Sequence, residues 1–131
     1  MVGLKGVPAL LSPELLYALA RMGHGDEIGL GIPQLLEAAL KLLPLDTYVE
    51  SPAAVMELVP SDKERGLQTP VWTEYESILR RASCARALAK IERFEFYERA
   101  KKAFAVVATG ETALYGNLIL KKGVLALNLL L

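Results

Sequence analysis

The stretch that decides the fold is Asn117-Leu118-Ile119-Leu120-Lys121-Lys122-Gly123-Val124-Leu125-Ala126-Leu127. Two short apolar runs, 117–120 and 124–127, are joined here by two lysines and a glycine, which predicts a closing β-hairpin. Upstream, residues 105–109 (Ala-Val-Val-Ala-Thr) form a run typical of a buried strand. Because helices are interleaved with the strands along the chain, we expect an α/β fold whose antiparallel hairpin makes the sheet mixed.

Helix starts are marked by proline, twice directly after a capping residue. Ser12-Pro13 predicts a helix that ends near Gly23, and Thr69-Pro70 repeats the signal further along the chain. Apolar residues at helical spacing predict another helix from Pro33 to about Leu43. Glu95 to Phe104 has the composition of a fourth helix. Further strands are predicted at 48–49, 55–59 and 90–94, and the polar, turn-rich segment 60–66 is predicted to be a surface loop.

The composition favours one domain, residues 1–131, because this length can bury a core without disulfides or metals. Fifteen Lys plus Arg balance fifteen Asp plus Glu, and the basic residues are scattered in pairs. Nucleic acid and anionic membrane are therefore not expected as partners. The single cysteine, Cys84, cannot form an intramolecular disulfide, which fits a reducing compartment.

No segment offers the roughly 18 uninterrupted apolar residues that a membrane span needs. The first apolar stretch is broken by Lys5, Glu14 and Arg21 and does not resemble a signal peptide, so we expect a cytoplasmic protein. Apolar residues make up 53% of the chain, and the tail from Val124 to Leu131 would be exposed unless it is covered. Burial in a homo-oligomer interface or packing on its own domain would cover it.

His24 is the only histidine in the chain and lies between two glycines in Met22-Gly23-His24-Gly25-Asp26-Glu27. An imidazole has an ordinary pKa of about 6.5, so it can both give and take a proton near neutral pH. The flanking glycines permit a close approach by a ligand. General acid/base chemistry is one interpretation of His24, and a structural, hydrogen-bonded histidine is the other.

Two tyrosines, an asparagine and an aspartate are further candidates. Tyr97 and Tyr115 carry phenols that stay protonated at neutral pH and can donate a hydrogen bond to an oxygen, although such residues also serve as core. Tyr115-Gly116-Asn117 places a hydroxyl and a carboxamide around a glycine, which suits vicinal sugar hydroxyls or an ordinary turn. Asp46 can orient a proton carrier or act as a capping aspartate. Together these residues indicate an uncharged, polyhydroxylated ligand.

Several other chemistries lack their residues. Gly29-Leu30-Gly31 is followed by neither a third glycine nor Lys-Ser/Thr, and no Gly-x-Ser-x-Gly sequence occurs. Phosphoryl transfer, nicotinamide chemistry and serine hydrolysis are therefore disfavoured. One histidine without a spaced set of Cys or carboxylate partners also supplies too few ligands for a metal.

Three blocks, found in order over nearly the whole chain, resemble the L-fucose mutarotase family, whose members are related to D-ribose pyranase. The match is closest to the animal members. The blocks are Leu11 to Ile28 around Met22-Gly23-His24-Gly25-Asp26-Glu27, Arg93-Phe94-Glu95-Phe96-Tyr97-Glu98-Arg99 with the five residues after it, and Thr109-Gly110-Glu111 leading through Tyr115-Gly116-Asn117 to Gly123.

The resemblance implies a three-layer α/β/α fold with a mixed central sheet, as in D-ribose pyranase. It implies interconversion of the α and β anomers of L-fucose, no cofactor and no metal, and assembly into dimers or larger rings with sites near subunit interfaces. By the same resemblance, His24 matches the family's proton donor, and Asp46 and Tyr97 match its other catalytic positions. The matching sugar-contacting positions are Met56, Tyr115, Asn117 and, from bacterial relatives, Arg93.

The chain departs from the family pattern after Ile28, which runs directly into Gly29-Leu30-Gly31-Ile32-Pro33. By comparison with the family, an internal segment of about twenty residues is absent here, as in a splice variant or an edited form of a longer chain. That segment carries a strand and a substrate-binding aspartate. We therefore expect its loss to open the sheet centre or force a new pairing, and to reduce or abolish activity.

Three functions stay open on these residues. The first is an L-fucose mutarotase, impaired by the shortening. The second is a catalytically silent or sugar-binding subunit that oligomerises with intact partners. The third is a D-ribose pyranase.

Overall fold

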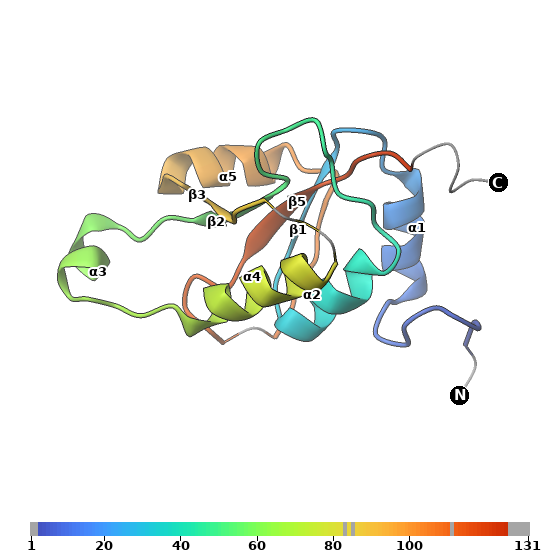
Figure 1. Cartoon of the computed structure of the whole chain (residues 1–131), viewed down its shortest axis with the longest axis horizontal. Coiled ribbons are helices and arrows are strands. Elements are labelled where there is room, and N and C mark those ends of the chain that lie inside the picture. The colour runs from blue at the N-terminus through green and yellow to red at the C-terminus, as the bar shows by residue number, and fades with distance from the viewer. Residues whose placement is uncertain (1–2, 83, 85, 111, 126–131) are drawn as a thin grey trace.

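One five-stranded sheet organises the residues that the computed structural model describes, which are 3–82, 84, 86–110 and 112–125. Its strand order is β3-β2-β5-β1-β4 (Figure 1). The strands are β1 (Glu27–Leu30), β2 (Ala53–Met56), β3 (Ala89–Ile91), β4 (Ala105–Val106) and β5 (Leu118–Lys121). β5 is antiparallel to both its neighbours, whereas β1 with β4 and β2 with β3 are parallel pairs. The predicted mixed sheet is confirmed.

Helices cover both faces of this sheet. They are α1 (Pro13–Arg21), α2 (Pro33–Leu40), α3 (Pro60–Glu64), α4 (Pro70–Arg81) and α5 (Arg93–Lys101). Figure 1 shows α2 and α4 together on one side of the strands and α5 on the other. Leu118 and Leu120 belong to the main apolar cluster, whereas the intervening Ile119 is buried outside it. Since successive strand side chains point to opposite faces, the predicted α/β/α layering is confirmed.

The predicted helix starts are correct at both capping sites. The Ser12 hydroxyl accepts a hydrogen bond from the Leu15 amide at 3.1 Å, so α1 begins as expected. α4 begins at Pro70, but the Thr69 side chain makes no capping bond. α1 ends at Arg21 with Met22 as its C-cap, so the predicted stop at Gly23 directly after the cap is correct, whereas α2 ends at Leu40 rather than near Leu43.

β1, over Glu27–Leu30, was not predicted from the sequence, yet it lies inside the sheet between β5 and β4. Ile28 faces Leu120 of β5 on one side and Ala105 of β4 on the other. The point after Ile28, where the family pattern is interrupted, therefore falls within a strand that is paired on both sides. The loss of the segment was expected to open the sheet centre or to force a new pairing. The sheet is not open at this point, because β1 is hydrogen-bonded to a strand on each side.

Two predictions failed because helices begin earlier than the sequence pattern indicates. Segment 60–66 was expected to be a loop, but Pro60 begins the short helix α3, with Asp62 in its first turn. The strand predicted at 90–94 stops at Ile91, because the Glu92 carboxylate caps α5. It accepts hydrogen bonds from the amides of Phe94 and Glu95 at 2.9 and 3.1 Å. Two other predicted strands, 55–59 and 105–109, are shorter than expected and end at Met56 and Val106.

The predicted hairpin over 117–127 is wrong where the structure describes it. Val124 and Leu125 are not in a strand, and residues 126–127 lie outside the described residues. β5 instead pairs with β1 and β2, which come from the first half of the chain. The strand predicted at 48–49 is also absent, because the Asp46 carboxylate accepts the Tyr48 amide in a local turn.

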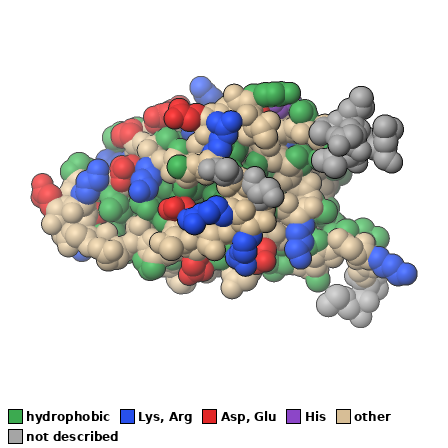
Figure 2. All heavy atoms as spheres, viewed as in Figure 1, with side chains coloured by type: hydrophobic (Ala, Val, Ile, Leu, Met, Phe, Trp, Pro, Cys, Tyr) green, Lys and Arg blue, Asp and Glu red, His purple; other side chains and the backbone are tan. Residues whose placement is uncertain are grey.

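The surface carries both signs of charge, as the composition predicts. On the face shown in Figure 2, Lys and Arg side chains are interspersed with Asp and Glu. Among the residues that the structure describes, no helix is both long and apolar enough to cross a bilayer.

Candidate functional site

His24 lies on a tight turn between α1 and β1. The amide of Gly23 donates to the Asp26 carboxylate at 2.7 Å, which closes the turn on itself. Gly25 has a φ of 87°, a backbone conformation that favours glycine, and its amide donates to the Lys122 carbonyl at 2.8 Å. The glycines that flank His24 therefore form the turn, and the imidazole is left 40% exposed at its tip.

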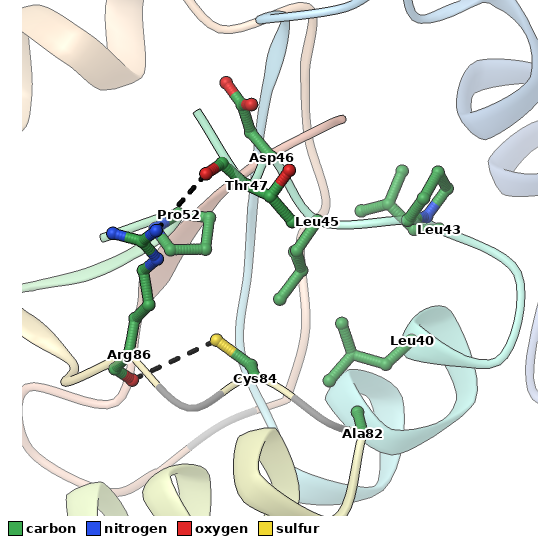
Figure 3. A pocket seen from close by; sticks show the side chains of 10 residues that line it. Leu40, Leu43, Leu45, Asp46, Thr47, Pro52, Ala82, Cys84 and Arg86 are labelled. Atoms are coloured by element: carbon green, nitrogen blue, oxygen red, sulfur yellow. Dashed lines mark hydrogen bonds between the residues drawn. The ribbon is translucent and has the colours of Figure 1, made fainter. Parts of the chain in front are cut away.

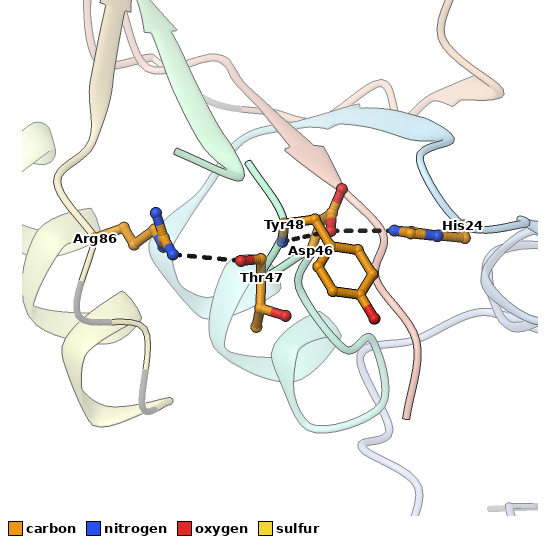
Figure 4. A network of polar contacts seen from close by, with 5 residues as sticks. All are labelled: His24, Asp46, Thr47, Tyr48 and Arg86. Carbon is orange, nitrogen blue, oxygen red and sulfur yellow. Dashed lines mark hydrogen bonds and ion pairs between the residues drawn. The ribbon is translucent and has the colours of Figure 1, made fainter. Parts of the chain in front are cut away.

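The buried carboxylate of Asp46 holds the His24 ring. Only 4% of Asp46 is exposed, and its Oδ1 accepts from His24 Nε2 at 3.1 Å and from the Tyr48 amide at 3.0 Å (Figure 4). The Tyr48 ring packs against the imidazole, with centroids 5.2 Å apart. With the Nε2 proton directed at Asp46, the neutral ring carries its lone pair on Nδ1, so Nδ1 is the nitrogen that can exchange a proton with a ligand.

Asp46 is held in its charged form. The Tyr48 amide is the largest cause that lowers the pKa of this carboxyl below its ordinary value; the hydrogen bond and charge of His24 and the charge of Lys121 act in the same direction, and burial opposes them. The carboxylate is thus ionised at neutral pH, where it can orient the imidazole and stabilise its protonated form.

The loop that carries Asp46 is fixed by a residue that the sequence pattern did not reveal. The Arg86 guanidinium donates to the Thr47 carbonyl at 3.3 Å (Figure 4). It also donates to the Glu50 carbonyl at 3.3 Å. Behind this loop is a cavity of about 370 Å³, and Cys84 lies half-buried in its wall (Figure 3). Arg86 is therefore a clamp for the loop and reaches it from the segment after α4.

Gly123 makes the close packing behind Asp46 possible. A methyl group at this position would lie 2.5 Å from the Leu45 carbonyl oxygen and 2.7 Å from the Asp46 Cα. Because both contacts are with backbone, Gly123→Ala is expected to destabilise the fold by about 1–3 kcal/mol and to displace Asp46. Urea unfolding measures the loss. Gly3→Ala is the control, since nothing lies within 4 Å of that position, and equal stability of the two variants would contradict the packing argument.

A second group of candidates surrounds Tyr115, which has a φ of 59°. Its hydroxyl donates to the Asp62 carboxylate at 2.6 Å and accepts from the Val59 amide at 3.3 Å. Its carbonyl oxygen accepts from the indole N–H of Trp72 at 2.9 Å. The hydrogen bond to Asp62 is the main cause that raises the pKa of Tyr115, and the same bond is the main cause that lowers the pKa of Asp62. A left-handed backbone at a non-glycine residue, held by three hydrogen bonds, is typical of a functional position.

Three other predicted residues, Met56, Arg93 and Asn117, adjoin this second group, and Tyr97 is on the helix that begins at Arg93. Met56 is the last residue of β2, and Arg93 is the first residue of α5, from which its charge acts on Tyr115. Tyr97 follows one helical turn later, is 46% exposed, and meets the Phe94 ring edge-on. Asn117 directly precedes β5 and lies beside Gly31.

His24 and Asp46 thus lie at one end of the sheet, whereas Met56, Tyr115 and Asn117 lie at the other; α5, which carries Tyr97, reaches the His24 end by Arg99, which binds Glu27 of β1. Asp46 and Gly25 bind the carbonyls of Lys121 and Lys122, at the end of β5, whereas Asn117 precedes its start. Five residues of extended chain span about 17 Å, so His24 and Asp46 do not meet the Tyr115 group within one chain.

The chain offers a metal ion few ligands. Within the described ranges, no group of three or more His, Cys, Asp or Glu is placed to hold a metal. His24 Nε2 and Asp46 Oδ1 are hydrogen-bonded to each other, so neither atom is available as a metal ligand in this arrangement.

Comparison with known proteins supports the resemblance. The model of the RbsD / FucU transport protein family matches residues 29–125, so the match begins directly after Ile28, where the family pattern is interrupted. Fucose mutarotase of Homo sapiens is 81% identical, and the comparison covers 100% of both chains. That alignment has 154 positions for the 131 residues of this chain, so 23 positions hold no residue of it, which agrees with a shortened form.

Solved structures share the fold. A fucose mutarotase of Streptococcus pneumoniae, in complex with L-fucose, has a TM-score of 0.86 at 39% identity, over 94% of this chain and 100% of that one. Bacillus subtilis RbsD, complexed with D-ribose, has a TM-score of 0.68 at 19% identity, over 89% and 96%, which shows the fold alone. On the family match over residues 29–125 and the similarity of these relatives, this chain belongs to the RbsD/FucU family.

Proposed function

We propose that this chain binds L-fucose and interconverts its α and β anomers by general acid/base catalysis. The observation that carries the proposal is the His24–Asp46 pair, in which a buried carboxylate orients a 40% exposed imidazole. The human relative is named a fucose mutarotase, and the relative from Streptococcus pneumoniae was crystallised with L-fucose. We further propose that the protein acts in the cytoplasm.

Ring opening requires two proton transfers. One proton leaves the anomeric hydroxyl as its oxygen becomes a carbonyl oxygen, and another reaches the ring oxygen as the C–O bond breaks. We assign His24 Nδ1 and the Tyr97 hydroxyl to these transfers, and Asp46 to the orientation of His24. Met56, Arg93, Tyr115 and Asn117 are assigned to sugar contacts. Rotation about the freed C–C bond and closure by the reverse steps give the other anomer.

The two groups of residues act together only if a second copy brings them together. We therefore propose a homo-oligomer, a dimer or larger ring, in which the His24 end of one copy meets the Tyr115 end of the next and the Tyr97 hydroxyl of that next copy takes part. Beside His24 is an apolar groove of about 710 Å³, whose walls include Leu16, Leu42 and Val124. Leu42 is 41% exposed and Val124 54%, so this groove presents uncovered apolar surface directly next to the proton carrier.

A charge in this groove is expected to prevent self-association. Leu42→Glu places a carboxylate on the apolar surface and leaves the hydrogen bonds of His24 untouched, so the protein is expected to sediment as a monomer. Glu37→Ala on the exposed side of α2 is the control and is expected to keep the parental mass. A Leu42→Glu variant with unchanged mass in analytical ultracentrifugation would show that the copies meet elsewhere.

The test of function is anomer exchange measured by NMR saturation transfer with L-fucose and D-ribose. Faster exchange of L-fucose than of the free sugar supports the proposal, and faster exchange of D-ribose alone would favour a pyranase. We propose that the shortening lowers the rate below that of the human relative, because a wall of the site is absent; equal rates would contradict this. A subunit that forms mixed oligomers without turnover would be the silent alternative.

A further inference from the structure

We propose that Asp62 is a positioning residue of the sugar site: its carboxylate accepts the hydrogen bond that the Tyr115 hydroxyl donates, so that the hydroxyl oxygen accepts a hydrogen bond from a sugar hydroxyl and does not donate one. The inference rests on the proposed function and adds to it a residue and a direction for one sugar contact. Asp62 was predicted to lie on a plain surface loop, and nothing in the local sequence distinguishes it from its charged neighbours.

The geometry around Tyr115 leaves one role for its hydroxyl. A phenol has one proton to donate, and here that proton is directed at the Asp62 carboxylate at 2.6 Å. Of the acceptor capacity of the oxygen, part is used by the Val59 amide at 3.3 Å, a long hydrogen bond. What the oxygen can still offer a ligand is a lone pair, so the group that it selects is a sugar hydroxyl with its proton available.

Asp62 comes from a part of the fold that has little other anchorage. α3 projects from the body at the end of two extended arms (Figure 1), and none of its five residues, all of them described, is buried. Arg65 binds the second oxygen of Asp62 at 2.6 Å from the solvent side. The carboxylate is therefore held between an exposed guanidinium and a half-buried phenol, and it fixes both the hydroxyl and the position of α3 over the site.

The charge of Asp62 is suited to this task. A carboxylate can only accept hydrogen bonds, whereas an asparagine amide at the same place can also donate one to the phenol oxygen. Asp62→Asn therefore frees the Tyr115 proton or occupies the lone pair intended for the sugar, without a change in side-chain size. Expected is a three- to tenfold weaker binding of L-fucose, about the value of one hydrogen bond.

Trp72 is a built-in reporter for the experiment. It is the only tryptophan of the chain, its N–H binds the Tyr115 carbonyl, and its ring meets the Tyr115 ring edge-on at 6.4 Å. Titration with L-fucose, followed by Trp72 fluorescence, gives the affinity without any need for turnover. The matched control is Lys63→Ala on the same helix, which removes an exposed charge and is expected to change the affinity by less than twofold.

A double-mutant cycle tests whether Asp62 acts through the Tyr115 hydroxyl or only holds α3 in place. In a Tyr115→Phe background, Asp62→Asn is expected to change L-fucose binding by less than twofold, because the hydroxyl on which Asp62 acts is gone. If the full three- to tenfold loss persists in that background, Asp62 does not act through Tyr115 and the inference is wrong. If the parent chain itself shows no L-fucose binding, the proposed function fails, which is a different and recognisable result.

Discussion

His24→Ala is expected to remove the acceleration of L-fucose anomer exchange and to leave the rate of the free sugar. A positioned acid or base contributes about 10²- to 10⁴-fold, and His24 is the only imidazole in the chain. The measurement is saturation transfer between the two anomeric protons, with the same substitution made in the human relative as a reference for the uninterrupted chain. Sugar affinity is expected to change far less than the rate, since the sugar contacts come from the other group of residues.

Asp46→Asn completes this test, because asparagine has the size of the aspartate that binds His24 but has no charge. The rate is expected to fall less than with His24→Ala, since the imidazole is still present but no longer oriented by a carboxylate. The lowered pKa of the Asp46 carboxyl means that this carboxylate keeps its charge throughout the neutral pH range in which the rates are compared. A His24→Ala variant with the parental rate at pH 7 would exclude His24 as the proton carrier.

The same depressed pKa values predict how stability depends on pH. Asp46 and Asp62 hold their protons less tightly in the fold than in the unfolded chain, whose carboxyls titrate near 3.9. Their stabilising contribution is therefore complete above that value and is lost as the pH falls through the lower folded pKa values.

Features set by neighbouring residues could be predicted from the sequence. Ser12-Pro13 and Thr69-Pro70 mark helix starts through local sterics and capping, and both helices begin there. α3 was not predicted because its five residues form no apolar face that would reveal a helix. Its significance depends on a hydrogen bond between Asp62 and Tyr115, residues 53 positions apart, which no local pattern encodes.

The mixed sheet was predicted for a partly incorrect reason. An antiparallel strand at 117–120 was expected; β5 forms at Leu118–Lys121, but its partners are β1 and β2 and not the residues that follow it. This long-range pairing also builds the His24 site, because the amides of Gly25 and Asp46 bind successive carbonyls at the end of β5. The residue types of the site were therefore recognisable, whereas their division between two ends of the sheet required the topology.

That division yields the second large effect, which is complementation between two inactive variants. His24→Ala removes one of the two proposed proton carriers and Tyr97→Phe removes the other, so each variant alone is expected to lose most of its exchange activity. When the two are co-expressed, some interfaces join an intact His24 of one copy to an intact Tyr97 of another. Random pairing makes roughly a quarter of the sites complete, and about that share of the parental activity is expected to return.

A mixture of His24→Ala with Asp46→Ala is the matched control. Both substitutions damage the same end of the sheet, so every interface in this mixture contains a damaged proton carrier and no activity is expected to return. Recovery in the first mixture and not in the second requires that one site draws residues from two copies. The expected quarter assumes equal amounts of both variants and unchanged assembly. Expression level and oligomer mass are therefore checked before the exchange rates are compared. If neither mixture recovers although mixed oligomers form, the two ends do not share a sugar, and His24 must work with groups on its own copy.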